Sequence, residues 1–332
     1  MHSNRTCLTP RDAKLIVRYL DGVDDVVSAR LANGFNPHED HLTSLLCEML
    51  DDNLTSLSAL PFPLSKLREE LALDAKGLRV SLSIEVKKYP PHIERRLTSS
   101  DIGIIVNYRD NITYNRSFEK GALFQAKKLY RSSPDQLYSL HDKFKEFDAD
   151  QLLRFLKLQT DDEMREMHHH KSDLHSSLCH YLLYCPRIDG YDEQAREEVH
   201  HFIIPSSDIF DFAEGWHRYE LANDPARHVP GLLASGLDWL SSDYLERNQD
   251  GHVTVKPRKD KPTARQAFQQ FWEDVYPFSW FLVYKMLMGD GGTSDSHSLS
   301  IVRGNEKEQN VDNPVLPKYI MTLRVEAGTA RG

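Results

Sequence analysis

The sequence feature that most constrains the fold is a change in the spacing of apolar residues near position 78. Before it, apolar residues recur at helical intervals, whereas Leu78–Lys87 alternates apolar and polar residues as a half-buried strand does. Two further β-rich segments follow at Asp101–Tyr108 and Gly121–Tyr130, with a polar, turn-like stretch between them. Three successive strands with short connections predict an antiparallel meander.

Helical patterns precede and follow these strands. Arg11–Leu20 and Asp24–Asn33 have apolar residues at helical spacing, and Asn36-Pro37-His38-Glu39 marks the start of another helix. Pro134–Leu158 is expected to be mostly helical, and Leu178–Tyr184 is an apolar run that suits a buried strand. The resulting order, α-β-β-β-α-β, predicts an α/β fold with a mixed sheet flanked by helices.

The chain is long enough for additions to this core. Its 332 residues exceed the ~250–300 at which a single hydrophobic core usually stops growing. We therefore divide it into an N-terminal helical segment (1–35), a core (36–204) and a C-terminal α+β region (205–332). In the last region, Thr263–Met288 is expected to be helical in part and Lys318–Glu326 to form a final strand.

Composition narrows the class of protein. No apolar run reaches the ~18–20 residues that cross a bilayer, and the N-terminal stretch does not have the pattern of a secretory signal. The four cysteines form no CxxC pair and suit a reducing compartment. We expect a cytoplasmic protein with no membrane partner.

Basic residues are concentrated in one part of the chain. The net charge is −9, but the stretch from Lys76 to Arg131 holds twelve Lys and Arg and five Asp and Glu, a local charge of +7. The rest of the chain then carries −16. Such asymmetry is typical of a protein with a local anionic partner, although a solvated sheet face has the same composition.

The predicted strands carry polar side chains that could act together in catalysis. Gln125 and Lys127 project to one face of an extended chain, and Asp101 opens the neighbouring strand. Pairing of the two strands would bring together a carboxylate, a carboxamide and an ammonium. A carboxylate and an amide oxygen suit Mg²⁺, and a lysine beside them can offset charge that grows on a phosphate.

The order of elements and the pattern Asp101-x(n)-Gln125-x-Lys127 resemble the PD-(D/E)XK nuclease superfamily. The likeness is to the QxK branch found in Mrr-like, methyl-directed type IV restriction enzymes and related phage-defence nucleases, and it spans roughly residues 36 to 186. It implies a restriction-endonuclease-like core with a C-terminal α+β extension for substrate selection, dimerisation or regulation. The sequence departs from the family pattern at Gln125, which replaces an acidic ligand, and in having no proline before Asp101.

The resemblance implies a role for each matching residue. Asp101 corresponds to the central metal ligand, Gln125 to the second ligand position, Lys127 to the catalytic lysine and Glu39 to an auxiliary metal ligand. The cofactor would be Mg²⁺, with Mn²⁺ as a substitute. We expect nucleic-acid contacts from basic side chains in the same stretch, namely Lys87, Lys88, Arg95, Arg96, Lys128 and Arg131.

These expectations combine into a function. The chain would be a metal-dependent nuclease that hydrolyses phosphodiester bonds of double-stranded DNA in defence against phage or foreign DNA. We expect a homodimer, because cutting both strands needs two sites, or a partner subunit of a defence system. The alternative is a catalytically silent nucleic-acid-binding protein, or a subunit of a defence complex, with the same fold; the neutral Gln125 keeps this alternative open.

Each site residue also has a structural alternative. Glu39 would suit a capping box with Asn36, in which its carboxylate binds the backbone N–H of the cap. Asp101 would suit a turn that precedes a strand. Lys127 would suit an edge strand, where lysine discourages aggregation.

Other polar residues are less specific. Glu94 and Gln151 lie near the predicted site segments, and we expect Gln151 to be a structural amide. A zinc site would have to use the histidine-rich stretch that includes His168–His170, His175 and His180, but these residues lack the spacing of known zinc motifs. We expect that stretch to be a polar loop.

Overall fold

The fold is described from a computed structural model. It describes residues 6–33, 37–53, 60–72, 78–89, 100–113, 116–133, 135–144, 152, 154–156, 158, 178–203, 230–236, 245–247, 253–255, 261–271, 274–289, 291–304 and 317–329.

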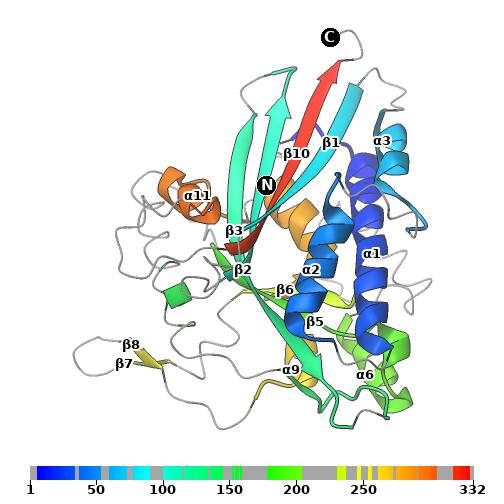
Figure 1. Cartoon of the computed structure of the whole chain (residues 1–332). Coiled ribbons are helices and arrows are strands. Elements are labelled where there is room, and N and C mark those ends of the chain that lie inside the picture. Colours follow the sequence, from blue (N-terminus) through cyan, green and yellow to red (C-terminus); the bar gives the residue numbers. More distant parts are fainter. Residues whose placement is uncertain are drawn as a thin grey trace.

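The fold is built on a mixed eight-stranded sheet with helices on both faces (Figure 1). Along the sheet the strands follow the order β1-β10-β2-β3-β5-β6-β9, and β4 pairs with β3 at the side. Their bounds are β1 (Leu78–Lys88), β2 (Ser100–Asp110), β3 (Phe118–Tyr130), β4 (Lys143–Phe144), β5 (Cys179–Tyr184), β6 (Leu232–Ser235), β9 (Val275–Pro277) and β10 (Pro317–Thr329). A separate hairpin joins β7 (Leu245–Arg247) to β8 (Val253–Val255). The α/β class with a mixed sheet flanked by helices is confirmed.

The predicted meander is only half right. β2 and β3 form the expected antiparallel hairpin, but β1 is not next to β2. The last strand, β10, lies between them, antiparallel to β1 and parallel to β2. Its alternating burial matches a strand with one face in the core. Local sequence patterns cannot show this insertion, because the partners of β10 are more than 200 residues away along the chain.

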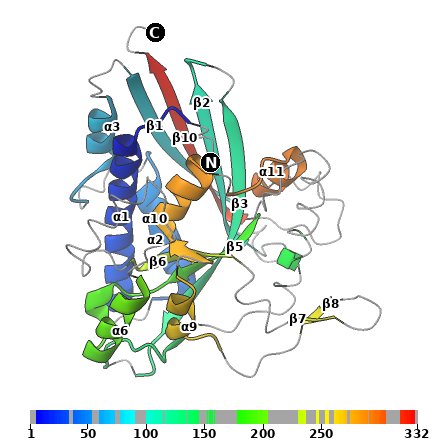
Figure 2. The same ribbon diagram turned by 180° about the vertical axis from the view of Figure 1, so that it is seen from behind.

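One face of the sheet is covered by the N-terminal helices and by a later helical segment. These elements are α1 (Pro10–Ala32), α2 (Glu39–Leu50), α3 (Leu64–Ala72), α10 (Phe278–Trp280) and the π-helical η3 (Phe281–Leu287). α1 packs against α2, α3, α10 and η3; Figure 2 shows α10 between α1 and the strands.

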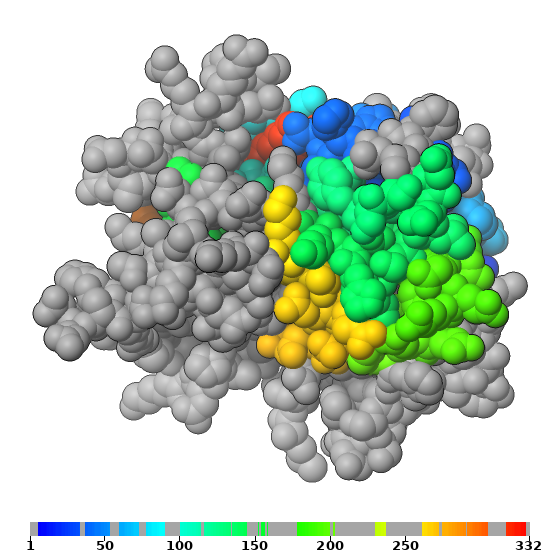
Figure 3. All heavy atoms as spheres, turned by 90° about the horizontal axis from the view of Figure 1, so that it is seen from below, coloured from blue at the N-terminus to red at the C-terminus, as the bar shows by residue number. Residues whose placement is uncertain are grey.

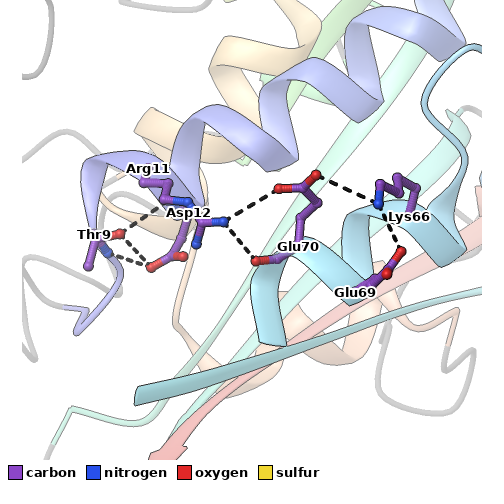
Figure 4. Close-up of polar contacts among 6 residues, drawn as sticks. All are labelled: Thr9, Arg11, Asp12, Lys66, Glu69 and Glu70. Carbon is purple, nitrogen blue, oxygen red and sulfur yellow. Dashed lines mark hydrogen bonds and ion pairs between the residues drawn. The ribbon is translucent and has the colours of Figure 1, made fainter. Parts of the chain in front are cut away.

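The N-terminal helix is a single element rather than the two predicted segments. Thr9 caps it in a capping box with Asp12, and Pro10 occupies the first turn, so the chain begins this helix abruptly. Arg11 of α1 donates to the backbone and side chain of Glu70 on α3, and Lys66 pairs with Glu70 and Glu69 (Figure 4). These contacts align α1 and α3 over the sheet.

The opposite face is covered in part by α11 (Ser296–Val302). Its side chains Leu299 and Val302 pack directly onto Gly121 of β3, and the backbone oxygen of Val302 would lie 2.6 Å from a Cβ at Gly103 of β2. Glycine at these two positions therefore allows α11 to approach the strands closely.

The segment after β3 differs from the helix predicted over residues 134–158. Residues 135–144 form turns and β4, while residues 152, 154–156 and 158 are helical. Figure 3 views this end of the molecule, where the segments around β4, α6 (Glu193–Ile203) and α9 (Ala264–Gln269) share one surface. Bridges from Tyr138 to Tyr191 and from Lys143 to Thr263 connect them.

Strands from both sides of the predicted division at residue 204 belong to the same sheet. β6, β9 and β10 all come from the stretch assigned to a C-terminal addition, and all three are strands of the central sheet. The predicted Thr263–Met288 helix is interrupted, since β9 separates α9 from α10. The predicted final strand is confirmed as β10. None of the helices in the described ranges is both long and apolar enough to cross a bilayer.

Candidate active site

The candidate site forms where β3 extends past the start of β2. β2 begins at Ser100 and β4 pairs with β3 only from Leu129, so the short stretch of β3 between them lies outside both pairings. The first backbone N–H on this edge, that of Ala126, donates to Oδ2 of Asp101 at 2.8 Å. A side chain thus continues the pairing that the strand backbone has ended.

The next N–H on the same edge is bound by the first helix of the predicted core. The backbone N–H of Lys128 donates to Oε2 of Glu39 at 3.0 Å. Glu39 is the first residue of α2, and the cap residue is His38 rather than the predicted Asn36. The capping-box geometry is therefore not formed, because Glu39 does not stand at the third helical position. Glu39 instead reaches β3.

Strand register places the other predicted residues beside these carboxylates. Ile102 is level with Phe124, so Asp101 is level with Gln125 and shares its face of the sheet. Lys127 follows two residues along on that face. Gln125 is 7% exposed and Lys127 is 5% exposed, so both side chains are held within the fold. The four residues predicted from the sequence thus meet at one edge of β3.

The charges of the site act on one another. Burial, and after it the nearby negative charge of Glu39, raise the pKa of Asp101 to about 7. The Ala126 N–H and the positive charge of Lys127 act in the opposite direction. Two carboxylates and one ammonium therefore interact electrostatically at this edge.

The two adjacent lysines of β3 have different roles. Lys128 is 1% exposed, and its Nζ donates to the backbone oxygen of Pro37 at 2.8 Å and lies over the Tyr130 ring. It fixes the segment before α2 and is not placed for the predicted nucleic-acid contact, because its ammonium is buried. Arg131 also contacts its own chain, through the backbone oxygen of Gln136 and the ring of Tyr138.

Of the remaining predicted residues, two lie on the surface, one is buried, and the others lie outside the described residues. Lys87 and Lys88 are exposed at the end of β1. Arg95, Arg96, Glu94, Gln151 and the histidines 168–170 and 175 lie outside the described residues. His180 is buried on β5 against Phe124 and Phe281, so it packs in the core.

The site contains a second lysine, Lys318, that the sequence patterns do not indicate. Lys318 on β10 is level with Asp101, because Pro317 pairs with Ser100 and Tyr319 with Ile102. Its Nζ lies 3.3 Å from Oδ1 of Asp40, the residue after Glu39. The Lys318 side chain is 16% exposed, while that of Asp40 is 74% exposed, so this ion pair lies at the rim of the site. Only the insertion of β10 next to β2 reveals this residue.

The donor set suits a hard divalent cation. Glu39 and Asp101 offer carboxylate oxygens and Gln125 a carboxamide oxygen. Burial and the repulsion from Glu39 both disfavour the charged form of Asp101, and a cation would relieve both effects. The set is small: within the described ranges no group of three or more His, Cys, Asp and Glu side chains is arranged to hold a metal. Comparison of the chain with protein-family models, curated proteins and solved structures found no match.

Proposed function

We propose that this protein is a Mg²⁺-dependent nuclease that hydrolyses phosphodiester bonds of double-stranded DNA. The observation that carries the proposal is the meeting of Glu39 and Asp101 on the two backbone N–H groups that flank Lys127. These carboxylates come from different elements and are held in place by the backbone that carries the lysine. The proposal includes a restriction-endonuclease-like core around this site, with Mn²⁺ as an alternative metal.

Each side chain then has a task. Glu39, Asp101 and Gln125 would hold the metal, which when bound polarises the phosphate and lowers the pKa of a water molecule. Lys127 directs its ammonium toward the attacked phosphate and offsets the negative charge that grows there. The backbone hydrogen bonds keep both carboxylates oriented, so little reorganisation is needed when substrate arrives.

The role in defence against phage or foreign DNA rests on the resemblance of the residue pattern. A homodimer would supply the two sites that a double-strand cut requires. An alternative is a protein that binds DNA with this fold but does not cut it, since Gln125 removes one negative ligand.

The function is tested by incubating the protein with supercoiled plasmid, linear DNA and RNA in Mg²⁺, Mn²⁺ or EDTA. We expect cutting of DNA only with a metal, and loss of cutting in Glu39→Gln. Glu48→Gln, the same change at an exposed position on α2, is the control and should cut normally. DNA binding without cutting under every condition would instead support the silent alternative, and an absence of both would contradict the proposal.

Lys318→Gln is expected to raise the KM for DNA about three- to tenfold while kcat changes little. Its ammonium lies at the rim beside Asp40, where it would meet a phosphate next to the bond that is cut. Steady-state cleavage kinetics check this, with Lys66→Gln on α3 as the matched surface control. An unchanged KM would show that Lys318 has only a structural role.

Gln125→Glu is expected to make the protein depend more strongly on metal. A third carboxylate at a position that is 7% exposed repels Glu39 and Asp101, so the melting temperature should fall in EDTA. Mg²⁺ should then raise it by more than in the wild type, because the metal gains an anionic ligand. Gln136→Glu, at an exposed site, should show neither change. Equal Mg²⁺ responses of Gln125→Glu and wild type would argue against a metal at this position.

A further inference from the structure

A concave region of the surface lies on the sheet face that carries α11. It is a groove of about 640 Å³, within the usual range for sites that hold small molecules. Residues from β1, β10, β2 and β3, together with the end of α11, line it. They are Lys87, Lys88, Tyr89, Ile105, Asn107, Glu119, Arg303, Ile320, Thr322 and Arg324.

The groove has an excess of positive charge. Four of its lining side chains are Lys or Arg and one is Glu. Glu85, just outside the groove, lies 3.3 Å from Lys87 and 2.9 Å from Arg324, and Arg303 pairs with Glu119. Counting Glu85, the groove has a net charge of +2. A phosphate monoester carries about −1.5 to −2 at pH 7, which complements this charge.

The floor of the groove is part apolar and part polar. Ile105 and Ile320 are buried there, and Asn107 and Thr322 lie in the same face of the sheet as half-buried polar side chains. Such a floor suits the sugar and base of a nucleotide: apolar surface covers the ring, while amide and hydroxyl groups offer hydrogen bonds.

The groove is separated from the candidate active site by the end of α11. Along β2, Gly103 stands between Asp101 of the site and Ile105 of the groove, and the backbone of Val302 packs onto it. Beyond Val302, the hydroxyl of Tyr89 donates to the backbone oxygen of Arg303 at 2.9 Å. Gly304, with φ of +71°, leaves room for the Tyr89 ring. The end of α11 therefore lies on the sheet face between Asp101 and Ile105.

We propose that this groove is a separate binding site for a mononucleotide. Lys87 and Arg324, both exposed and both adjacent to Glu85, would bind the phosphate, with the sugar and base over Ile105 and Ile320. Glu119, which pairs with Arg303, would accept a hydrogen bond from an amino group of the base. This site does not depend on the nuclease chemistry, since it contains none of Glu39, Asp101, Gln125 and Lys127. Lys87 and Lys88, which the sequence analysis assigns to nucleic-acid contacts, would here line the nucleotide site.

Isothermal titration of the full chain in EDTA tests the proposal. AMP, GMP, CMP and UMP are titrated separately, along with inorganic phosphate and a short single-stranded DNA. We expect at least one mononucleotide to bind with a Kd below about 1 mM and more tightly than phosphate. Arg324→Gln and Lys87→Gln should each weaken binding about tenfold or more. The Lys87 side chain is 70% exposed and that of Arg324 is 47% exposed, so these variants should keep the wild-type melting temperature.

Arg109→Gln is the matched control. Arg109 on β2 lies on the same face of the sheet as Arg324, but it pairs with Glu326 outside the groove. It should bind the nucleotide as the wild type does. The proposal is overturned if no mononucleotide binds, or if binding is unchanged in both groove variants. It is also overturned if only the DNA oligonucleotide responds to these variants, which would make the groove a nucleic-acid surface.

Discussion

Lys127→Met is expected to slow DNA cleavage by about 100- to 1,000-fold while the protein remains folded. The side chain is 5% exposed and lies on the same face of β3 as Gln125. Its positive charge lowers the pKa of Asp101, so Lys127 interacts electrostatically with the carboxylates of the site. Methionine keeps the length and bulk of the side chain but removes the charge that would offset the charge on phosphate.

The measurement is single-turnover cleavage of plasmid with saturating Mg²⁺, together with a melting curve. Lys66→Met, the same change on the surface of α3, is the control and should cleave normally. A Lys127→Met protein that cleaves within about threefold of wild type would remove Lys127 from the chemistry. Loss of cleavage together with unfolding would assign the residue a structural role.

Asp101→Asn is expected to abolish cleavage and, in EDTA at pH 8, to stabilise the fold by about 2 to 4 kcal/mol. Burial and the neighbouring Glu39 raise the pKa of Asp101 to about 7. In the unfolded chain the pKa of this carboxyl group is near its ordinary value of 3.8. Between pH 3.8 and pH 7 the folded state therefore binds the proton more tightly than the unfolded state does. Wild-type stability therefore falls as the pH rises toward 7, and asparagine removes that loss.

The sign of this effect can be checked on the same strand. At pH 4 the gain in stability from Asp101→Asn should largely vanish, since the wild-type carboxyl is then mostly protonated in the folded state and partly so in the unfolded one.

Asp110→Asn should have the opposite effect on stability at pH 8. Burial opposes ionisation of Asp110, but hydrogen bonds from Thr113 and Ile112 outweigh it and lower its pKa to about 2. Chemical denaturation at pH 4 and pH 8 measures both variants, and equal stability of Asp101→Asn and wild type at pH 8 would contradict the site geometry.

Much of the site follows from local patterns in the sequence. Alternation along β3 places Gln125 and Lys127 on one face, and the change of period near residue 78 separates the helices from the strands. The hairpin of β2 and β3 then brings Asp101 level with Gln125. These inferences need only short-range periodicity and one antiparallel pairing.

Other features depend on long-range packing and could not be predicted. β10 lies between β1 and β2, so Lys318 reaches the site from the far end of the chain. Alternation separates Lys127 from Lys128 but does not show that Lys128 is buried under Pro37. The groove likewise needs α11 packed onto Gly103, a contact with no local signal.

Binding of Mn²⁺ tests the candidate site most directly, because it needs no assumption about substrate. Electron paramagnetic resonance of free Mn²⁺ is recorded during titration of the wild type, Asp101→Asn, Glu39→Gln and the control Glu48→Gln. We expect the wild type and Glu48→Gln to bind Mn²⁺, and each site variant to lose at least about 90% of the affinity, since one of two carboxylates is removed. Equal Mn²⁺ binding by all four proteins, or none by the wild type, would contradict a metal site formed by Glu39 and Asp101.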